Sequence, residues 1–241
     1  MLLTLLLLAL VAIAFVLIPQ FIVDEIIVEG NSYYTSDAII EASGIGLGDE
    51  ILSVFMSDLD ENAFYASCPY IRSVTVTCGF SKVWIRVDEV EDLMYTSDVE
   101  GNWYAIDTDL RVWQRSSTPI PFREFLHVRL PAFYPTERGS KISFVNGSLT
   151  YDYIGELIRV LKEQNVLSAV DYINYSDKFS VSFVFGGRIR LELGAVADME
   201  RKLSRFSHIL SEKSDTEYAV IDVSDPDRAV YRAVSANDIY R

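Results

Sequence analysis

The sequence predicts an α+β protein with an apolar anchor, a small first domain and a larger second domain. Three observations predict this organisation. An uncharged apolar run occupies residues 2–18 of the 241-residue chain. Strand-like alternation and helix-like periodicity are interspersed in the rest of the chain, which is typical of α+β folds. The pattern changes after about residue 91, where a region with aromatic-rich hairpin strands begins.

The apolar run predicts a retained transmembrane helix over residues 1–19. Thr4 is its only polar side chain, and Pro19 ends it. As a helix the run spans about 25 Å, slightly less than a hydrocarbon core of about 30 Å. Two alternatives stay open. A cleaved signal peptide would have a basic start and a small-residue cleavage site after the run, and a buried core helix would be amphipathic.

The overall charge restricts the classes of partner. The chain has 35 acidic and 21 basic residues, which gives a net charge of -14. Phosphate binding needs clustered Lys and Arg, so this balance argues against a nucleic-acid partner. It also argues against adsorption to an anionic membrane surface.

The two cysteines, Cys68 and Cys78, are expected to be free thiols. Residues 71–78 have the pattern of one extended strand, which would carry Cys78 about 25 Å from Cys68. A disulfide needs Cα atoms within about 7 Å. We expect Cys68 to pack as a small hydrophobic side chain.

The first domain is predicted as strand, helix, helix, strand, strand, with the helices on one face of a three-stranded sheet. A strand ends at the turn pair Gly30 and Asn31, and Thr35 or Ser36 caps the first helix. Gly44 ends that helix in a left-handed conformation. The second helix is expected to start at Ser57 or Asp58 and to end before the proline at position 69. Two strands follow, over 71–78 and 82–90.

The second domain is predicted to alternate short strands with two amphipathic helices. Ser148 is the expected cap of the first helix, whose apolar face comprises Leu149, Tyr153, Leu157 and Leu161. Gly186 and Gly187 give a strong two-residue hairpin signal. Residues 116–147 hold four prolines and have little periodicity. The expected elements are a hairpin over 102–115, a helix over 149–164, strands over 170–175, 179–185 and 188–193, a helix over 197–212, strands over 217–223 and 229–234, and a frayed tail.

No motif indicates catalysis, a metal site or a cofactor. The histidines His127 and His208 lie far apart in sequence, and we interpret both as structural. The stretch GIGLGDE at 44–50 follows a helix, whereas a dinucleotide loop follows a strand, so we interpret it as a helix end and a turn. The acidic pair Asp107 and Asp109 permits a glycosidase or calcium-loop hypothesis, but a solvated acidic edge is the favoured interpretation.

The order of motifs in the first domain resembles a POTRA domain. These are a strand ending in Val28, Gly30 and Asn31, a capped helix at Ser36, the GIGLG stretch at 44–48, and PYIRSVTV at 69–76. A membrane anchor followed by POTRA resembles the FtsQ/DivIB family of bacterial cell-division proteins. Four later segments are also similar to motifs of this family: YAIDTDLRV, RLPAF, IRLELGAVADMERKLSRFSHIL and AVIDVSDPDRAVYR. Leu110 stands where the family usually has glycine, and CGFSK (78–82) replaces its usual Trp-Pro turn.

The resemblance implies a non-enzymatic divisome scaffold with no cofactor. It implies a transmembrane anchor over residues 1–19, a POTRA domain over 20–91, a β domain with an extended antiparallel sheet over 92–234, and a tail over 235–241. The folded domains would lie outside the plasma membrane at the division septum, with a cytoplasmic N-terminus. The implied partners are FtsB/DivIC-type and FtsL-type division proteins and the septal wall-synthesis complex.

The resemblance also implies where these partners bind, namely by adding a strand to the C-terminal edge of the β domain. The implied partner-binding residues are Ala219, Val220, Ile221, Asp222, Val223, Ser224, Arg228, Val230, Tyr231 and Arg232. The alternative is that 219–232 is only a closing hairpin of the core. Two other functions are weighed against the scaffold. An outer-membrane assembly component would need many barrel strands after POTRA, and a wall enzyme would need a catalytic cluster.

Overall fold

The computed structural model describes residues 21–119, 125–145, 153–211 and 217–240, which form two compact units that divide after Val90. The anchor predicted over residues 1–19 lies outside the described residues. Among the helices that the structure describes, none combines the length and the apolar composition needed to cross a bilayer.

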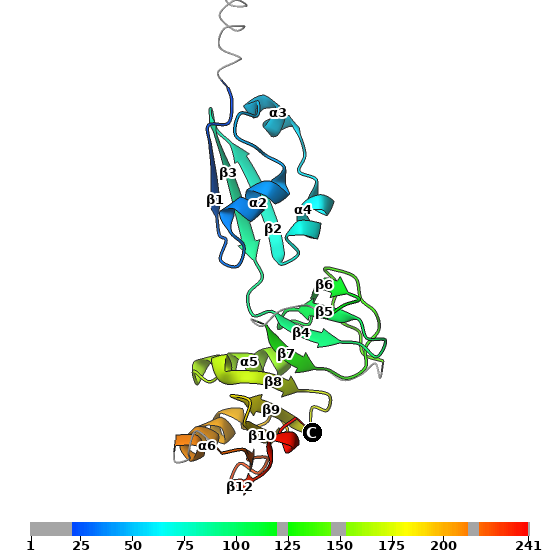
Figure 1. Cartoon of the computed structure of the whole chain (residues 1–241), viewed down its shortest axis with the longest axis vertical. Helices are drawn as coiled ribbons and strands as arrows, with labels where there is room; N and C mark the ends of the chain where they lie inside the picture. Colours follow the sequence, from blue (N-terminus) through cyan, green and yellow to red (C-terminus); the bar gives the residue numbers. More distant parts are fainter. Residues whose placement is uncertain (1–20, 120–124, 146–152, 212–216, 241) are drawn as a thin grey trace, which may run out of the picture. The chain divides into compact units, whose positions relative to one another are not determined.

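The first unit is a three-stranded sheet with helices on one face (Figure 1). The central strand β3 pairs in parallel with β1 and antiparallel with β2, so the sheet order is β1-β3-β2. This arrangement confirms the predicted three-stranded sheet. The elements are β1 (Glu25–Glu29), α2 (Ser36–Ser43), α3 (Ile51–Met56), α4 (Glu61–Ser67), β2 (Ile71–Cys78) and β3 (Lys82–Glu89).

The ends of α2 follow the predicted capping pattern. The Thr35 hydroxyl oxygen accepts a hydrogen bond from the Ala38 amide at 3.2 Å, which satisfies one of the donors that a helix start leaves unpaired. Gly44 ends the helix with φ of 69°, and its amide donates to the Glu41 carbonyl. Glycine adopts the left-handed conformation at little energetic cost because it has no Cβ atom, and that is why a glycine ends this helix.

The predicted start of the second helix was wrong, and one helix was missed. The residues before Ser57 form α3, and Ser57 ends that helix. The next helix, α4, begins at Glu61 because the Asp60 carboxylate accepts a hydrogen bond from the Ala63 amide at 3.1 Å. The missed helix α3 was not recognised because Leu52, Phe55 and Met56 are exposed, so its apolar pattern does not mark a buried face.

Both cysteines are free thiols. Cys68 is 1% exposed and packs in the core of the first unit with Ile39, Phe64 and Ile85. Its predicted role as a small core side chain is confirmed.

The second unit is built on one nine-stranded sheet, in the order β12-β11-β10-β9-β8-β7-β4-β5-β6. Five of its eight strand pairs are antiparallel and three are parallel, so the sheet is mostly antiparallel. The strands are β4 (Met94–Ser97), β5 (Trp103–Ile106), β6 (Val112–Ser116), β7 (Leu126–Arg129), β8 (Val170–Asn174), β9 (Val181–Phe185), β10 (Ile189–Gly194), β11 (Ala219–Asp222) and β12 (Val230–Ala233).

The sequence did not predict strands β4 and β7. Strand β7 lies in the proline-containing stretch 116–147. It has only four residues and joins the two halves of the sheet, pairing in parallel with both β4 and β8. Val128 is its one fully buried side chain. One buried residue in a short strand leaves too little alternation to recognise.

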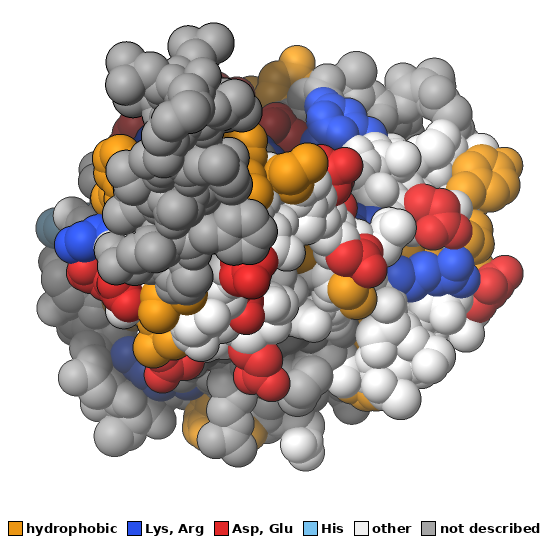
Figure 2. All heavy atoms as spheres, turned by 90° about the horizontal axis from the view of Figure 1, so that it is seen from above, with side chains coloured by type: hydrophobic (Ala, Val, Ile, Leu, Met, Phe, Trp, Pro, Cys, Tyr) orange, Lys and Arg blue, Asp and Glu red, His pale blue; other side chains and the backbone are white. Residues whose placement is uncertain are grey.

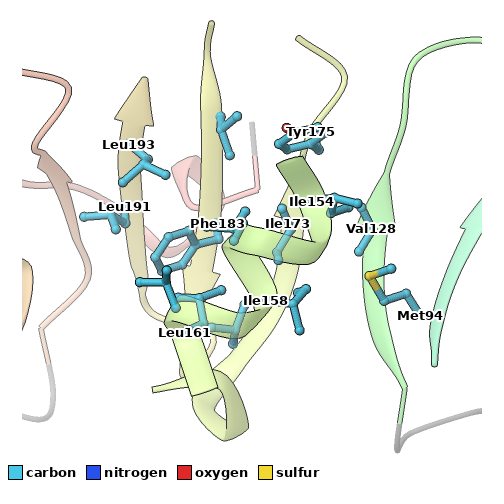
Figure 3. Packing of buried hydrophobic residues seen from close by; sticks show 14 of the residues in the cluster. Met94, Val128, Ile154, Ile158, Leu161, Ile173, Tyr175, Phe183, Leu191 and Leu193 are labelled. Carbon is cyan, nitrogen blue, oxygen red and sulfur yellow. The ribbon is translucent and has the colours of Figure 1, made fainter. Parts of the chain in front are cut away.

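Two helices, α5 (Tyr153–Glu163) and α6 (Met199–Ser211), pack on one face of this sheet. Figure 3 shows α5 crossing the sheet with Ile154, Ile158 and Leu161 pointing toward the side chains of Ile173 and Phe183. Tyr153 is 47% exposed, so its predicted place on the apolar face was wrong. The expected cap, Ser148, and Leu149 lie outside the described residues.

The opposite face of the sheet carries a row of aromatic rings and the C-terminal segment. His127 stacks on Tyr95 at 4.5 Å between ring centroids and lies 4.9 Å from Tyr172. The predicted fraying of the C-terminal residues was wrong, because Ile239 is fully buried. The Arg190 guanidinium also donates to the Asp238 carbonyl at 3.0 Å, which fixes a 3-10 turn (Ala236–Asp238) against β10.

Candidate partner-binding edge

Strand β12 is the last strand of the nine-stranded sheet at its C-terminal end. It pairs antiparallel with β11, and β11 pairs in parallel with β10. The sequence forms this hairpin because 225–228 makes a tight turn, in which the Asp225 carboxylate accepts from the Asp227 amide and the Asp225 carbonyl accepts from the Arg228 amide. The strand edge therefore lies at the end of a well-anchored hairpin.

The pairing register determines which backbone groups of β12 point away from the sheet. The Val234 amide donates to the Tyr218 carbonyl at 3.0 Å, and Arg232 pairs with Val220 in the same register. In antiparallel pairs, hydrogen-bonded and non-hydrogen-bonded positions alternate. The amide and carbonyl of Ala233 therefore point away from β11, as a strand-addition site requires.

The other edge of the sheet, at β6, is covered by the chain itself where β6 begins. The Val112 amide donates to the Ser140 carbonyl at 2.9 Å, and the Gly139 amide donates to the Val112 carbonyl at 2.7 Å. A bridge between Arg111 and Lys141 continues this cover. Within the described residues no comparable segment pairs with β12, so the two edges differ in their availability.

The predicted site residues divide into core and surface groups. Ala219, Val220, Ile221 and Val223 are at most 2% exposed and are buried in the sheet. They support the edge without presenting side chains to a partner. The positions whose side chains reach solvent fully or in part are Asp222, Ser224, Arg228, Val230, Tyr231 and Arg232.

Among the surface group, Tyr231 is held by a specific contact. Its hydroxyl lies 2.6 Å from a Glu217 carboxylate oxygen and donates to it. This hydrogen bond to the carboxylate is the main reason that the pKa of Tyr231 is raised, because loss of the phenol proton would place two negative charges together. The ring also packs against the core cluster. The contact orients the tyrosine at the middle of the edge strand.

Two arginines of α6, which sequence reasoning missed, anchor the hairpin turn. The Arg205 guanidinium donates to the Asp227 carbonyl at 2.6 Å, and the Arg201 guanidinium forms an ion pair with the Asp227 carboxylate. Both arginines are on the exposed side of an amphipathic helix, so their sequence pattern is that of ordinary solvated charges. They contact the 225–228 turn only in the folded chain, where α6 lies beside the hairpin.

Lys202 is the other residue that sequence reasoning did not assign. It is 3% exposed, and its ammonium donates to the carbonyl oxygens of Leu193 at 3.1 Å and Ala195 at 2.7 Å. Burial lowers the pKa of this ammonium, while Asp198 and Asp225 partly offset the effect. The lysine thus ties α6 to the end of β10, the strand on which the hairpin rests.

The two edges of the sheet differ: the chain itself covers the start of β6, and the β12 edge is exposed within the described residues. Among the described residues, no group of three or more His, Cys, Asp or Glu side chains is placed to hold a metal ion. The acidic side chains proposed as alternatives are used locally. Asp107, for example, accepts from the Asp109 and Arg111 amides and from the Trp113 indole nitrogen, each at 2.9 Å.

Comparison with known proteins identifies the family. The family model described as "Cell division protein FtsQ/DivIB, C-terminal" matches residues 97–224, which is more than half of the chain and most of the nine-stranded sheet. No curated protein matches the chain. The match includes β11 and ends at the start of the turn that leads to β12. From its fold and this match, the chain belongs to the FtsQ/DivIB family of cell-division proteins.

Proposed function

We propose that this protein is a non-enzymatic divisome scaffold, anchored in the plasma membrane by residues 1–19, that links septal wall-synthesis proteins. It binds FtsB/DivIC-type and FtsL-type division proteins, and the contact is an added strand on β12. Membership of a cell-division family supports the cellular role. The observation that carries the binding mode is the exposed edge at β12, at the opposite end of the sheet from β6, whose start the chain covers itself.

The chemistry of the edge suits recognition of an extended peptide. Main-chain hydrogen bonds supply the affinity in strand addition, and alternate side chains supply the specificity. Val230 is 42% exposed and offers an apolar contact, while Tyr231 and Arg232 belong to residue types that are favoured as binding anchors. No acidic residue occurs in 228–234, so this strand differs from the acidic remainder of the chain.

A proline substitution in the edge strand tests the binding mode. Ala233→Pro removes an amide that points away from β11, and an edge strand tolerates proline at a position whose N–H is not used in the ladder. We expect the full chain in detergent micelles to lose at least about tenfold in affinity for its FtsB/DivIC-type partner, as measured by titration calorimetry. That loss corresponds to about 1.4 kcal/mol, the worth of a hydrogen bond.

Ala236→Pro is the matched control for this experiment. Ala236 is the first residue of the 3-10 turn, directly after its N-cap Ser235, a position that tolerates proline. This variant should bind normally. Thermal unfolding of both variants establishes that they are folded. Undiminished binding by a folded Ala233→Pro chain would remove β12 as the binding edge.

A double variant tests the side chains. Tyr231→Ala together with Arg232→Ala should weaken partner binding. The unfolding temperature should fall modestly, because the Tyr231 ring packs against the core cluster, so binding is compared at a temperature at which both chains are folded. Tyr231→Phe separates the contribution of the ring from that of the hydroxyl group that contacts Glu217. Normal binding by the double variant would restrict recognition to the backbone. Deletion of 217–241 is unsuitable, because it removes the fully buried Ile221 and Ile239.

A further inference from the structure

The first unit exposes an apolar surface on helix α3. Leu52, Phe55 and Met56 are 61%, 72% and 76% exposed. Their spacing of three and four residues places them on one side of the helix, while Ile51 points into the core. Large apolar side chains exposed as a group indicate an interaction surface, whereas scattered ones need no explanation.

This surface continues onto the segment where the described chain begins. The Ile51 amide donates to the Phe21 carbonyl at 2.9 Å, and Ile22 bridges to Glu50. The ring of Phe21 stacks at 6.0 Å on that of Phe80, which lies in the β2–β3 turn and is 83% exposed. The start of α3, the chain entry and this turn therefore lie together at one end of the unit.

The sequence that precedes this end indicates what covers it. Only Pro19 and Gln20 separate Phe21 from the uncharged apolar run of residues 2–18. If that run crosses a bilayer, Phe21 lies at the membrane–water interface. The side chains of α3, which begins beside Phe21, are then close enough to reach the boundary between headgroups and acyl chains, where exposed apolar residues insert.

The charges around the surface select the type of lipid. Helix α3 has no charged residue, and the flanking side chains of Asp49, Glu50 and Asp58 are acidic and exposed. Figure 2, viewed toward this end, shows hydrophobic side chains interspersed with acidic and basic ones. Acidic flanks are repelled by anionic lipids, so contact must come from apolar insertion into a neutral, zwitterionic surface.

We propose that the exposed face of α3 (Leu52, Phe55 and Met56), together with Phe21 and Phe80, docks into the zwitterionic surface of the bilayer that holds the anchor. This rests on the membrane attachment in the proposed function, but it concerns a different surface from the β12 edge. Docking fixes the orientation of the first unit against the membrane plane. A tether of a few residues alone would leave that orientation free.

The test measures the depth of a nitroxide label on the full chain reconstituted in phosphatidylcholine vesicles at a low protein-to-lipid ratio. The background is Cys78→Ser, in which Cys68 is 1% exposed and must remain unlabelled. Phe55→Cys carries the label. Phe179→Cys in the second unit is the matched control, because Phe179 is 69% exposed and Phe55 is 72% exposed.

We expect oxygen, which concentrates in lipid, to relax the label at position 55 more than a water-soluble nickel complex does. The label at position 179 should show the reverse order. A label at 55 that is as accessible to nickel as the one at 179, on chains that float with the vesicles, overturns the docking proposal alone. Chains that fail to float with the vesicles overturn both the docking and the membrane attachment.

Discussion

Gly30 passes so close to Val87 that a Cβ atom at position 30 would lie 2.1 Å from the Val87 carbonyl oxygen. Gly30 also has φ of 88°, in the left-handed region. The turn after β1 therefore needs glycine for two reasons, its backbone conformation and its contact with the central strand. The sequence indicates only the first of them, through the pair Gly30 and Asn31.

Gly30→Ala should strongly destabilise the first unit. The left-handed conformation costs about 1–2 kcal/mol for a residue with a Cβ, and the clash with backbone adds about 1–3 kcal/mol. Gly48→Ala is the matched control, because Gly48 has φ of 89° and a Cβ atom there would meet no other atom within 4 Å. It should show the conformational cost alone. Hydrogen exchange of the β1 and β3 amides measures the loss of stability in each of the two variants. Equal protection in Gly30→Ala and Gly48→Ala would contradict the steric argument.

Lys202→Met should loosen the join between α6 and β10. The substitution keeps a long apolar side chain but leaves the carbonyls of Leu193 and Ala195 without the ammonium that contacts them. Loss of hydrogen bonding at buried groups costs about 1–3 kcal/mol. Thermal unfolding should show this loss for Lys202→Met and almost none for Lys141→Met, since Lys141 is exposed. A stable Lys202→Met chain would mean that water replaces the ammonium there.

Asp98 should make the second unit sensitive to strong acid. Burial acts to raise the pKa of this carboxyl, but hydrogen bonds from Asn102, Tyr104 and the Glu100 amide outweigh it, and the net pKa is lowered. A carboxyl whose pKa is lower in the folded state contributes stability above its unfolded value of about 3.9, and this is lost as pH falls through the folded value. The unfolding temperature should therefore fall more steeply between about pH 4 and pH 2 in the parent chain than in Asp98→Asn. Parallel pH profiles would contradict this assignment.

His127 should add a separate dependence at mildly acidic pH. Burial among Tyr95, Trp103 and Tyr172 lowers its pKa. A histidine whose pKa is lower in the folded state takes up its proton more readily when unfolded. Stability is therefore retained above about pH 6.5 and declines as pH falls below that unfolded value. His127→Phe keeps the ring contacts and should remove the decline between about pH 6.5 and pH 5. Persistence of the decline in this variant would assign it to another group.

The sequence predicted the elements whose signals are local. The turn at Gly186 and Gly187 joins two strands as expected, and both glycines have positive φ. Leu110 adopts φ of 62°, at the position where the resemblance expects glycine. Its side chain is 5% exposed, which explains how leucine is retained in a conformation that favours glycine: burial of the side chain offsets the backbone cost.

The features that the sequence did not predict depend on distant partners. Strand β7 forms by pairing with β4 and β8 on its two sides. Lys202 can be buried because two backbone carbonyls accept hydrogen bonds from its ammonium. The predicted binding residues were identified by position along β11 and β12. Ile221 is buried and Val230 is exposed because β11 lies inside the sheet and β12 lies at its edge. The alternation of side chains in two short strands does not reveal that order.

The unequal edges of the nine-stranded sheet limit how such a molecule assembles. A sheet that is exposed at both ends can add strands on either side and grow into a fibre. Here 139–142 cover the start of β6, whereas no segment of the described residues pairs with β12, so β12 is the more accessible edge for strand addition. Two copies that paired through their β12 strands would form a dimer with no β12 edge left exposed. A partner strand bound to β12 would likewise prevent further strands from adding there. The fold thus permits an extended exposed edge in a protein that must remain a discrete member of a larger complex.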